Sequence, residues 1–354
     1  MNADAPNLIH KITRRLEANE GGENCGLAHG EAMAVARILV EDVLHRNYTK
    51  VLAGVSKPLE ECEEKQLDDC VERIKGGEPV QYVVGSSLFC GIRIDVSASV
   101  LIPRPETEEL AEIVIEQVEA KKAKGQEQSG KGLNWKDEVR NSENLTLNCD
   151  SKVLNRDGKV QNRDSKAQDW DGKEPNKREQ LPNPHKRLRV MDACTGSGCL
   201  AIAIKKALPE SEVCACDISE SALALAQHNA QKNDCEIEFL KADLLRGDLP
   251  DGEYDIIVSN PPYVMEKEKA EMAKTVLDYE PALALFVKDD DPLVFYKSLA
   301  QWSKRALKEN GLLACEINAK LPVETADCFL DCGFRALTTR KDLFGKPRFL
   351  ICQK

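Results

Sequence analysis

Several features that would direct this chain to a membrane or to secretion are missing. No apolar run among its 354 residues approaches the length of about 20 residues that a membrane-spanning helix requires. The N-terminal stretch, with Asn2, Asp4, Asn7 and His10, lacks the charged-then-apolar layout of a signal peptide. We therefore expect a soluble, cytoplasmic protein that does not associate with a membrane.

The cysteines lack the spacing of a metal site. None of the 14 cysteines forms a Cys-x-x-Cys pair with partners at zinc spacing. Several stand in apolar runs, where cysteine behaves as a small hydrophobic residue. Cys214 and Cys216 alternate along one expected strand, so both side chains should point to one packed face. We expect reduced structural thiols and no metal.

An excess of positive charge is also missing. The net charge of −11 disfavours nonspecific binding to a phosphate backbone, so we expect no direct contact with nucleic acid. The length predicts about two domains, and the 42% of hydrophobic residues is typical of a globular protein. What remains is a globular protein with at least one folded core.

The first 120 residues predict two small units. Residues 1–85 show apolar residues at helical spacing in 31–44 and 59–74, with Gly76 and Gly77 ending the second helix. This helical domain has no catalytic constellation, and either substrate recognition or simple packing would explain it. Residues 86–120 predict a β-hairpin and a connecting helix. The two-residue period of the hairpin already begins at Tyr82, and Thr107 is the expected helix cap.

Residues 121–187 differ in composition from the rest. They carry sixteen Lys or Arg against eleven Asp or Glu and an imperfect seven-residue repeat. The repeat lacks the second apolar position of a coiled coil, and the composition predicts a disordered, low-complexity insertion. An electrostatic role near RNA is a minor alternative.

Strands and helices alternate in residues 188–354, which predicts a mostly parallel sheet with helices on both faces. The expected strands are 188–193, 212–217, 237–243, 254–260, 312–317 and 348–352. The expected helices are 199–208, 219–233, 293–307 and 323–332. The fold class is therefore α/β.

A glycine-rich turn follows the first expected strand: Asp192-Ala193-Cys194-Thr195-Gly196-Ser197-Gly198. Glycine lets backbone N–H groups approach a ligand closely. No Lys-Ser or Lys-Thr follows the last glycine, which excludes a P-loop nucleotide hydrolase. Asp217 ends the second expected strand, where a carboxylate can accept both hydroxyls of a ribose, and Asp243 ends the third.

The fourth strand end carries Asn260-Pro261-Pro262-Tyr263. A planar nitrogen with two N–H donors needs two acceptors in one plane, and the Asn260 side-chain oxygen with the Pro261 carbonyl would supply them. Tyr263 would stack on the planar group. A turn that merely ends a strand remains the plain alternative for these residues taken alone.

Taken together, these strand ends resemble a class I S-adenosylmethionine-dependent methyltransferase. The order of five segments narrows the resemblance to the peptide chain release factor N5-glutamine methyltransferases, the PrmC/HemK family. The segments are 79–85, Leu101 to Glu108, the glycine turn, Val258 to Tyr263, and Glu280-Pro281-Ala282-Leu283-Ala284-Leu285. The match spans nearly everything outside the insertion.

The resemblance implies a Rossmann-like, mostly parallel seven-stranded sheet preceded by an all-α domain and a β-hairpin. It implies S-adenosylmethionine as cofactor and the glutamine of the Gly-Gly-Gln loop of class 1 release factors as substrate. The cofactor-binding residues would be Cys194, Thr195, Gly196, Ser197, Gly198, Asp217, Asp243, Leu244 and Asn260. The substrate-binding residues would be Asn260, Pro261, Pro262 and Tyr263, of which Asn260, Pro261 and Tyr263 would be catalytic.

Two features depart from the family. Cys194 stands where the family usually has glycine, and the insertion is atypical. Two other functions therefore stay open at this point. An adenine-N6 methyltransferase on DNA or RNA would share the Asn-Pro-Pro-Tyr segment, although the acidic charge disfavours it. A protein that binds release factors or ribosomes without catalysis would explain Cys194 and the insertion.

Overall fold

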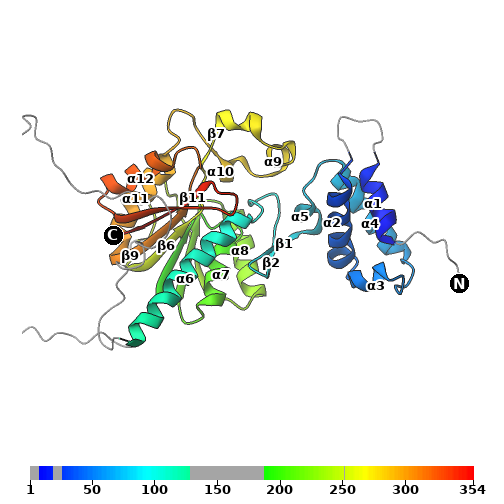
Figure 1. Cartoon of the computed structure of the whole chain (residues 1–354), viewed down its shortest axis with the longest axis horizontal. Coiled ribbons are helices and arrows are strands. Elements are labelled where there is room, and N and C mark those ends of the chain that lie inside the picture. Colours follow the sequence, from blue (N-terminus) through cyan, green and yellow to red (C-terminus); the bar gives the residue numbers. More distant parts are fainter. Residues whose placement is uncertain (1–7, 19–25, 128–186, 251) are drawn as a thin grey trace, which may run out of the picture.

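The computed structural model describes residues 8–18, 26–127, 187–250 and 252–354, and Figure 1 shows the whole chain. Most of the predicted insertion, including its repeat, lies outside these residues. Its first part corrects the prediction, because helix α6 (Pro105–Glu127) continues seven residues past the expected boundary at 120. Residues 121–127 are mostly good helix formers, which favours continuation of the helix.

Helices form the N-terminal part of the chain, as predicted. They are α1 (Leu8–Glu17), α2 (His29–Ile38), the π-helical turn η1 (Leu39–Val43), α3 (Tyr48–Leu52), α4 (Glu61–Lys75) and α5 (Val80–Val84). Their buried faces meet in one apolar cluster that includes Ile12, Leu39 and Val71, all fully buried or nearly so. Gly76 ends α4, as the sequence indicates.

The β-hairpin begins later than predicted. Strands β1 (Ser86–Phe89) and β2 (Ile92–Asp95) pair antiparallel, but Tyr82 to Val84 belong to the short helix α5. One helical turn directs Tyr82 into the core of the sheet domain and Val83 into the helical core. This packing against two cores overrides the β preference of the two valines. Gly85, with a φ of 74°, turns the chain from the helix into the hairpin.

Seven strands form the central sheet in the order β10-β11-β9-β6-β3-β4-β5. The four strands β6, β3, β4 and β5 and their neighbour β9 are parallel, whereas β11 is antiparallel to both β9 and β10. The strand bounds are β3 (Arg189–Ala193), β4 (Glu212–Asp217), β5 (Ile237–Lys241), β6 (Tyr254–Ser259), β9 (Leu307–Glu316), β10 (Arg335–Lys341) and β11 (Pro347–Gln353). A small pair, β7 (Val264–Met265) and β8 (Phe286–Val287), lies outside this sheet.

The predicted strands all exist, but two of their boundaries were wrong and one strand was missed. Strand β5 ends at Lys241, so Asp243 lies in the turn after it and not at its end. Strand β9 begins five residues before the predicted start at 312. Strand β10 was missed, because its residues, Arg-Ala-Leu-Thr-Thr-Arg-Lys, are largely polar for a sheet-edge strand with an open side.

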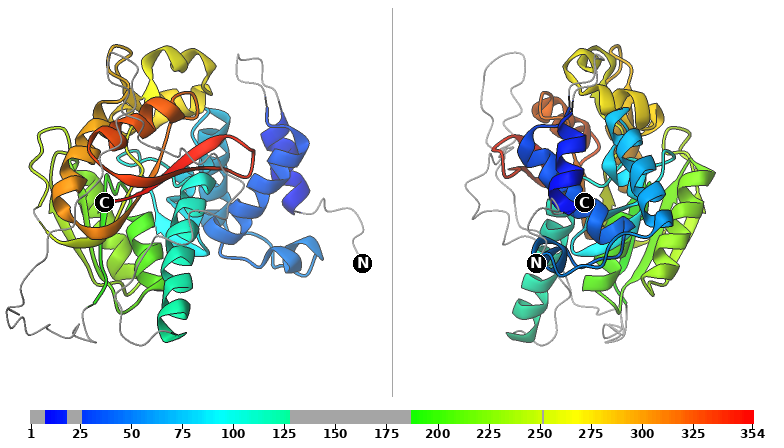
Figure 2. Two further views of the ribbon diagram at one scale, coloured as in Figure 1. Left: turned by 60° about the vertical axis from the view of Figure 1, so that its left-hand side comes forward. Right: turned by 90° about the vertical axis from the view of Figure 1, so that its right-hand side faces the viewer.

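Helices cover both faces of the sheet (Figures 1 and 2). Helices α6, α7 (Cys199–Ala207) and α8 (Glu220–Lys232) pack on one face, and α11 (Val294–Ala306) and α12 (Pro322–Asp331) pack on the other. Between β7 and β8 lie the 3₁₀ helix η3 (Glu266–Glu271) and the short helices α9 (Lys274–Tyr279) and α10 (Ala282–Leu285). Cys214 and Cys216 share the α11 face, as their spacing predicted. The described cysteines are all unpaired.

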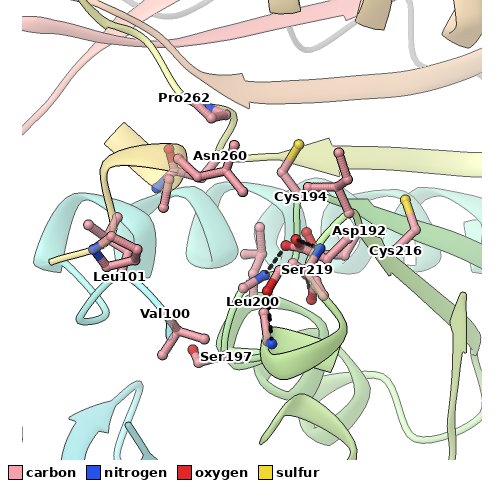
Figure 3. Close-up of a pocket in the computed structure, with 18 of the residues that line it drawn as sticks. Val100, Leu101, Asp192, Cys194, Ser197, Leu200, Cys216, Ser219, Asn260 and Pro262 are labelled. Atoms are coloured by element: carbon pink, nitrogen blue, oxygen red, sulfur yellow. Dashed lines mark hydrogen bonds between the residues drawn. The ribbon is translucent and has the colours of Figure 1, made fainter. Parts of the chain in front are cut away.

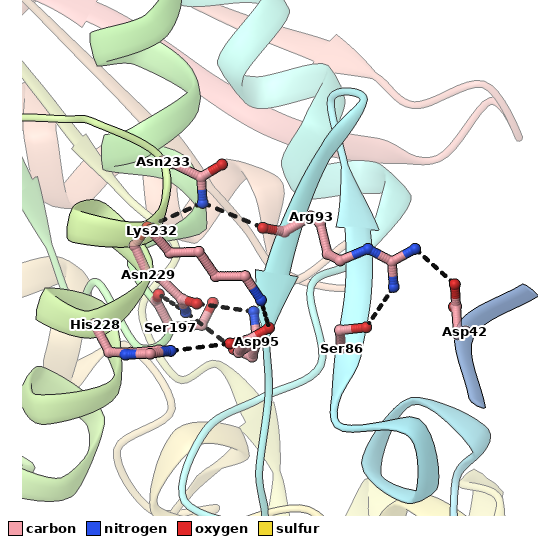
Figure 4. A network of polar contacts seen from close by, with 9 residues as sticks. All are labelled: Asp42, Ser86, Arg93, Asp95, Ser197, His228, Asn229, Lys232 and Asn233. Carbon is pink, nitrogen blue, oxygen red and sulfur yellow. Dashed lines mark hydrogen bonds and ion pairs between the residues drawn. The ribbon is translucent and has the colours of Figure 1, made fainter. Parts of the chain in front are cut away.

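The hairpin joins the two parts of the molecule (Figure 4). From one side, Arg93 on β2 forms an ion pair with Asp42 of the helical part at 2.6 Å. From the other, the carboxylate of Asp95 binds Lys232 and His228 of α8, at 2.7 and 3.1 Å. Among the helices of the described residues, none is long and apolar enough to cross a membrane.

Candidate active site

A cavity of about 350 Å³ opens at the carboxyl ends of β3, β4 and β6 (Figure 3). This is the edge where open α/β sheets bind ligands. Its walls come from the loop 99–104 with Thr107, the glycine turn with the start of α7, the segments 216–222 and 242–245, and residues of the 281–284 stretch. Figure 3 places Asn260 and Pro262 across the cavity from Ser197.

The sequence-predicted cofactor residues gather here with one exception. Those that line the cavity are Cys194, Thr195, Gly196, Ser197, Asp217, Asp243, Leu244 and Asn260. Gly198 does not line it. A Cβ at Gly198 would meet the Cβ of Ala226 at 3.0 Å, and its φ is 80°. Gly198 is therefore required for the close approach of α8 to the turn and for its left-handed backbone.

The glycine turn curls through several left-handed residues. Cys194 has a φ of 62° and Gly196 a φ of 55°. A side chain in this region costs about 1 kcal/mol, which explains why glycine suits position 194, and Cys194 adopts the left-handed backbone nonetheless. Burial raises the pKa of the Cys194 thiol well above its usual value, so the thiol stays neutral. Apart from its chain neighbours, none of the described residues comes within 4 Å of the position of a Cβ at Gly196.

Asp217 connects the glycine turn to the next loop. Its Oδ2 accepts a hydrogen bond from the Gly196 N–H at 2.9 Å, and its Oδ1 accepts one from the Ser219 N–H at 3.0 Å. Burial raises its pKa, while these backbone N–H groups oppose the shift. Each carboxylate oxygen keeps a second lone pair, so Asp217 can still accept the hydroxyls of a ribose.

Asp243 has a different environment in the turn after β5. Its Oδ1 accepts from the Leu245 N–H at 2.9 Å, and its Oδ2 lies 3.3 Å from Arg246. The carboxylate therefore organises its own loop, while the neighbouring Leu244 is buried at the cavity wall.

A buried carboxylate without a full set of partners lies beneath the turn. Asp192 Oδ2 accepts from the Thr195 hydroxyl at 2.6 Å, but Oδ1 has no partner at hydrogen-bonding geometry among the described residues. Burial raises the pKa of Asp192 to about 7, against the Thr195 hydroxyl and the nearby Ala201 N–H, which lower it. The Ser197 hydroxyl is also unpaired there. Buried polar atoms are normally paired, so these two predict a polar, partly cationic ligand.

Asn260 is held by a residue that sequence reasoning placed elsewhere. Its Nδ2 donates to the Thr107 hydroxyl at 2.9 Å. The prediction that Thr107 caps a helix is wrong. Helix α6 already begins at Pro105, and the Thr107 hydroxyl donates to the buried Glu316 at 2.8 Å. Among the described residues, none donates to Asn260 Oδ1, which leaves this oxygen available as an acceptor.

The remaining residues of the Asn-Pro-Pro-Tyr segment divide between cavity and core. Pro262 lines the cavity, whereas Pro261 and Tyr263 are not among its lining residues. The Tyr263 hydroxyl donates to Glu316 at 2.5 Å, and burial raises its pKa well above the usual value. Stacking of Tyr263 on a substrate stays a prediction, as does acceptance by the Pro261 carbonyl.

Two of the sequence motifs hold each other at the mouth of the cavity. Glu280 forms an ion pair with Arg104 and accepts from the Ile102 N–H at 3.2 Å. The Tyr82 hydroxyl donates to the Val100 carbonyl at 2.6 Å. The loop 100–104 is thereby fixed from both sides, as expected for a rigid, proline-rich segment that faces a ligand.

Sequence reasoning missed Glu316, Asn229 and the unpaired state of Asp192. Glu316 ends the apolar run Leu312 to Cys315 at the carboxyl end of a strand, the same signal that identified Asp217. Asn229 had no such signal, because its amide bonds to the N–H and carbonyl of Asp95 and to the carbonyl of Ser197, which are distant in sequence. Groups of three or more His, Cys, Asp or Glu that could hold a metal are absent from the described residues.

Two family models match the chain. Residues 8–85 match the PrmC N-terminal domain, and residues 178–282 match the methyltransferase small domain. The chain is 33% identical to the release factor glutamine methyltransferase of Bacteroides thetaiotaomicron over 92% of this chain and 93% of that protein. It is 35% identical to that of Flavobacterium psychrophilum, over 80% of this chain and 79% of the relative. The enzyme of the same name from Streptococcus pneumoniae is 28% identical over 92% of this chain and 93% of the relative.

The family matches and the structure together identify the fold and the cofactor. The helical N-terminal part and the mixed seven-stranded sheet confirm the class I methyltransferase fold. S-adenosylmethionine is the cofactor, and the cavity fits it: Asp217 would take its ribose, and the unpaired Asp192 oxygen would take its ammonium group. With relatives aligned along almost its full length, the chain belongs to the release factor glutamine methyltransferases.

Proposed function

We propose that this protein methylates the side-chain amide nitrogen of the glutamine in the Gly-Gly-Gln loop of class 1 peptide chain release factors. The protein is an S-adenosylmethionine-dependent glutamine methyltransferase by its family. The loop motif, the release-factor class and the nitrogen position are the proposed part. So is a cytoplasmic location, where translation termination takes place.

One observation carries the proposal. Asn260 lies at the cavity wall with its Nδ2 bound to Thr107, and no donor in the described part of the chain reaches its Oδ1. A primary amide carries two N–H donors and needs such an acceptor, whereas an ionised carboxylate has no donor to offer it. The cavity that contains Asn260 also contains the glycine turn and Asp217, so the acceptor and the cofactor residues face one space.

The main contribution of the protein's residues is to position the substrate amide, and acid–base catalysis contributes less. An amide nitrogen is a poor nucleophile because its lone pair is delocalised, so the main gain comes from alignment with the methyl group and from stabilising charge on nitrogen. The bound cofactor supplies an electrophilic methyl group. Asn260 Oδ1 would hold one amide N–H, and the Pro261 carbonyl the other. The fixed loop 100–104 and Pro262 would exclude water from the cavity.

The helical domain is the proposed contact for the body of the release factor. It is anchored to the catalytic part through the hairpin and through a hydrogen bond from the Tyr279 hydroxyl to the Gly76 carbonyl at 3.1 Å. This arrangement leaves the helices beside the cavity-bearing domain in Figure 1. The net charge of −11 favours a protein substrate over nucleic acid.

The test is methyl transfer from labelled cofactor to a recombinant release factor, followed by mass analysis of the loop peptide. We expect one methyl group on the glutamine with the wild type and a loss of about a hundredfold in rate with Asn260→Ala. Methylation of oligonucleotides without release factor would instead identify an adenine methyltransferase. Failure to bind the cofactor in calorimetry would identify a non-catalytic binding protein.

A further inference from the structure

Glu316 is a buried carboxylate that the proposed chemistry does not use. It ends strand β9 and is 2% exposed. Its Oε2 accepts from the Thr107 hydroxyl at 2.8 Å, and its Oε1 accepts from the Tyr263 hydroxyl at 2.5 Å. A carboxylate can only accept hydrogen bonds, so both hydroxyls must direct their protons at Glu316.

The orientation of the Thr107 hydroxyl in turn fixes the orientation of the Asn260 amide. Thr107 has a single hydroxyl proton, and that proton is engaged by Glu316. Toward Asn260, Thr107 Oγ1 can therefore act only as an acceptor, and only Nδ2 of the amide can donate to it. A flipped Asn260 would place Oδ1 against Thr107 Oγ1 with no proton between the two oxygens. The buried carboxylate thus sets which atom of Asn260 is left for the cavity.

The groups around Glu316 act on its pKa in opposite directions, and the net effect raises it. Burial is the largest influence and raises its pKa, and Glu106 raises it too. The hydrogen bonds from Tyr263 and Thr107 and the positive charge of Arg348 lower it. Arg348 is itself fixed by the buried Asp342, at 3.3 Å, so the cation stays close to the carboxylate.

We propose that Glu316 and Thr107 are positioning residues that orient the Asn260 amide, so that the substrate meets an acceptor and not a donor. The inference rests on the proposed function. It attributes selectivity for an amide nitrogen to three hydrogen-bonded side chains: Thr107 of α6, Glu316 of β9 and Asn260 after β6. A substrate glutamine is accepted because its NH₂ group donates to Oδ1, and a glutamate at the same place is refused because its carboxylate has no donor.

The test compares two substitutions of Thr107. Thr107→Val keeps the shape and removes the hydroxyl, so the Asn260 amide loses its fixed orientation, and kcat should fall about tenfold to a hundredfold. Thr107→Ser keeps the hydroxyl and should restore kcat to within about threefold of wild type. Cofactor affinity, measured by calorimetry, should change less than kcat in both, because the Thr107 hydroxyl bonds to Glu316 and Asn260 and not to the glycine turn. A Thr107→Val protein with wild-type kcat overturns the inference.

The pH profile separates positioning from simple stabilisation. Protonated Glu316 can donate to Thr107, which releases the Asn260 amide, so kcat of the wild type should fall as the pH drops through the raised pKa of Glu316. Tyr263→Phe removes one hydrogen bond that lowers this pKa, and it should move the acid limb to higher pH. Thr107→Val should lack the limb. An identical limb in Thr107→Val and wild type contradicts the inference.

The two proposals fail in different ways. If the wild-type protein transfers no methyl group to a release factor, the proposed function fails before Thr107 is tested. If the wild type is active and Thr107→Val matches it in rate and pH profile, only the positioning role fails. Thermal unfolding of each variant shows whether a loss of rate follows from a loss of folded protein.

Discussion

Arg104 and Glu280, which are 176 residues apart in the chain, form an ion pair at the mouth of the active-site cavity. The Glu280 side chain is 1% exposed and its second oxygen accepts from the Ile102 N–H. Two segments that were separate motifs in the sequence therefore act as one structure. The pair fixes the proline-rich loop against the segment that carries Pro281 and Leu283, which also line the cavity.

Glu280→Ala should destabilise the protein and impair methyl transfer. The substitution leaves the Arg104 guanidinium, whose side chain is 34% exposed, and the Ile102 N–H without their partner, which costs about 1 to 3 kcal/mol. We expect this loss in the free energy of unfolding, measured with urea, and a higher KM for the protein substrate because the loop 100–104 loosens. The control is Glu266→Ala, whose side chain is 54% exposed in a pair with Lys269 and should change stability little. Equal loss in both variants would show that the ion pair has no special role.

Asn229 should couple the hairpin to the cofactor turn. Its amide is fully buried, accepts from the Asp95 N–H at 2.8 Å, and donates to the carbonyls of Asp95 and Ser197, both at 2.9 Å (Figure 4). Asn229→Ala leaves these groups unpaired, so we expect a loss of about 2 to 3 kcal/mol in unfolding free energy and weaker cofactor binding.

The matched variant for this prediction is Asn233→Ala, four residues further along the chain at the C-cap of α8. Asn233 donates to the Arg93 carbonyl at 3.2 Å and to the Asn229 carbonyl at 2.9 Å, so its side-chain hydrogen bonds go to the hairpin and to α8. It should lower the unfolding free energy by less than about 1 kcal/mol and leave cofactor affinity unchanged. Unchanged cofactor affinity in Asn229→Ala as well would mean that the turn does not depend on the hairpin.

Asp192 should make both stability and cofactor binding depend on pH. Its pKa is about 7 in the folded, cofactor-free protein against the ordinary value of 3.8, so between these pH values the folded state holds a proton that the unfolded chain has lost. Its stabilising contribution is therefore complete below about pH 4 and is lost as the pH rises to about 7. Cofactor affinity should move in the opposite direction, rising as the carboxylate ionises and can pair with an ammonium group.

Asp192→Asn checks both effects. Without the titrating group, this part of the pH dependence of stability should disappear from urea unfolding curves of the cofactor-free protein. Cofactor affinity, measured by calorimetry between pH 6 and pH 8 or so, should be lower and flat. If the asparagine protein binds the cofactor as tightly as wild type, the unpaired oxygen does not receive the ammonium group.

The local patterns were sufficient for most of the fold. Apolar periodicity placed α4, α8, β3 and β6 to within a residue or two, because each buries a continuous stripe or a whole strand. The same rule, polar residues at strand ends, identified Asp217 and Asn260. It failed at the edge strand β10 and at α5, where one face is open or two cores compete for neighbouring side chains.

By itself, the sequence determined the order of the strands along the chain, the glycine turn, and the family to which both belong, because these depend on residues that are neighbours. Only the tertiary structure decided that Thr107 accepts a hydrogen bond from Asn260 and donates one to Glu316, and that Arg104 forms an ion pair with Glu280. These partners come from distant segments, and a hydrogen bond forms only where folding brings a donor and an acceptor within about 3 Å. Sequence spacing does not predict these contacts, because the order of the strands in the sheet, which brings the segments together, is set by packing.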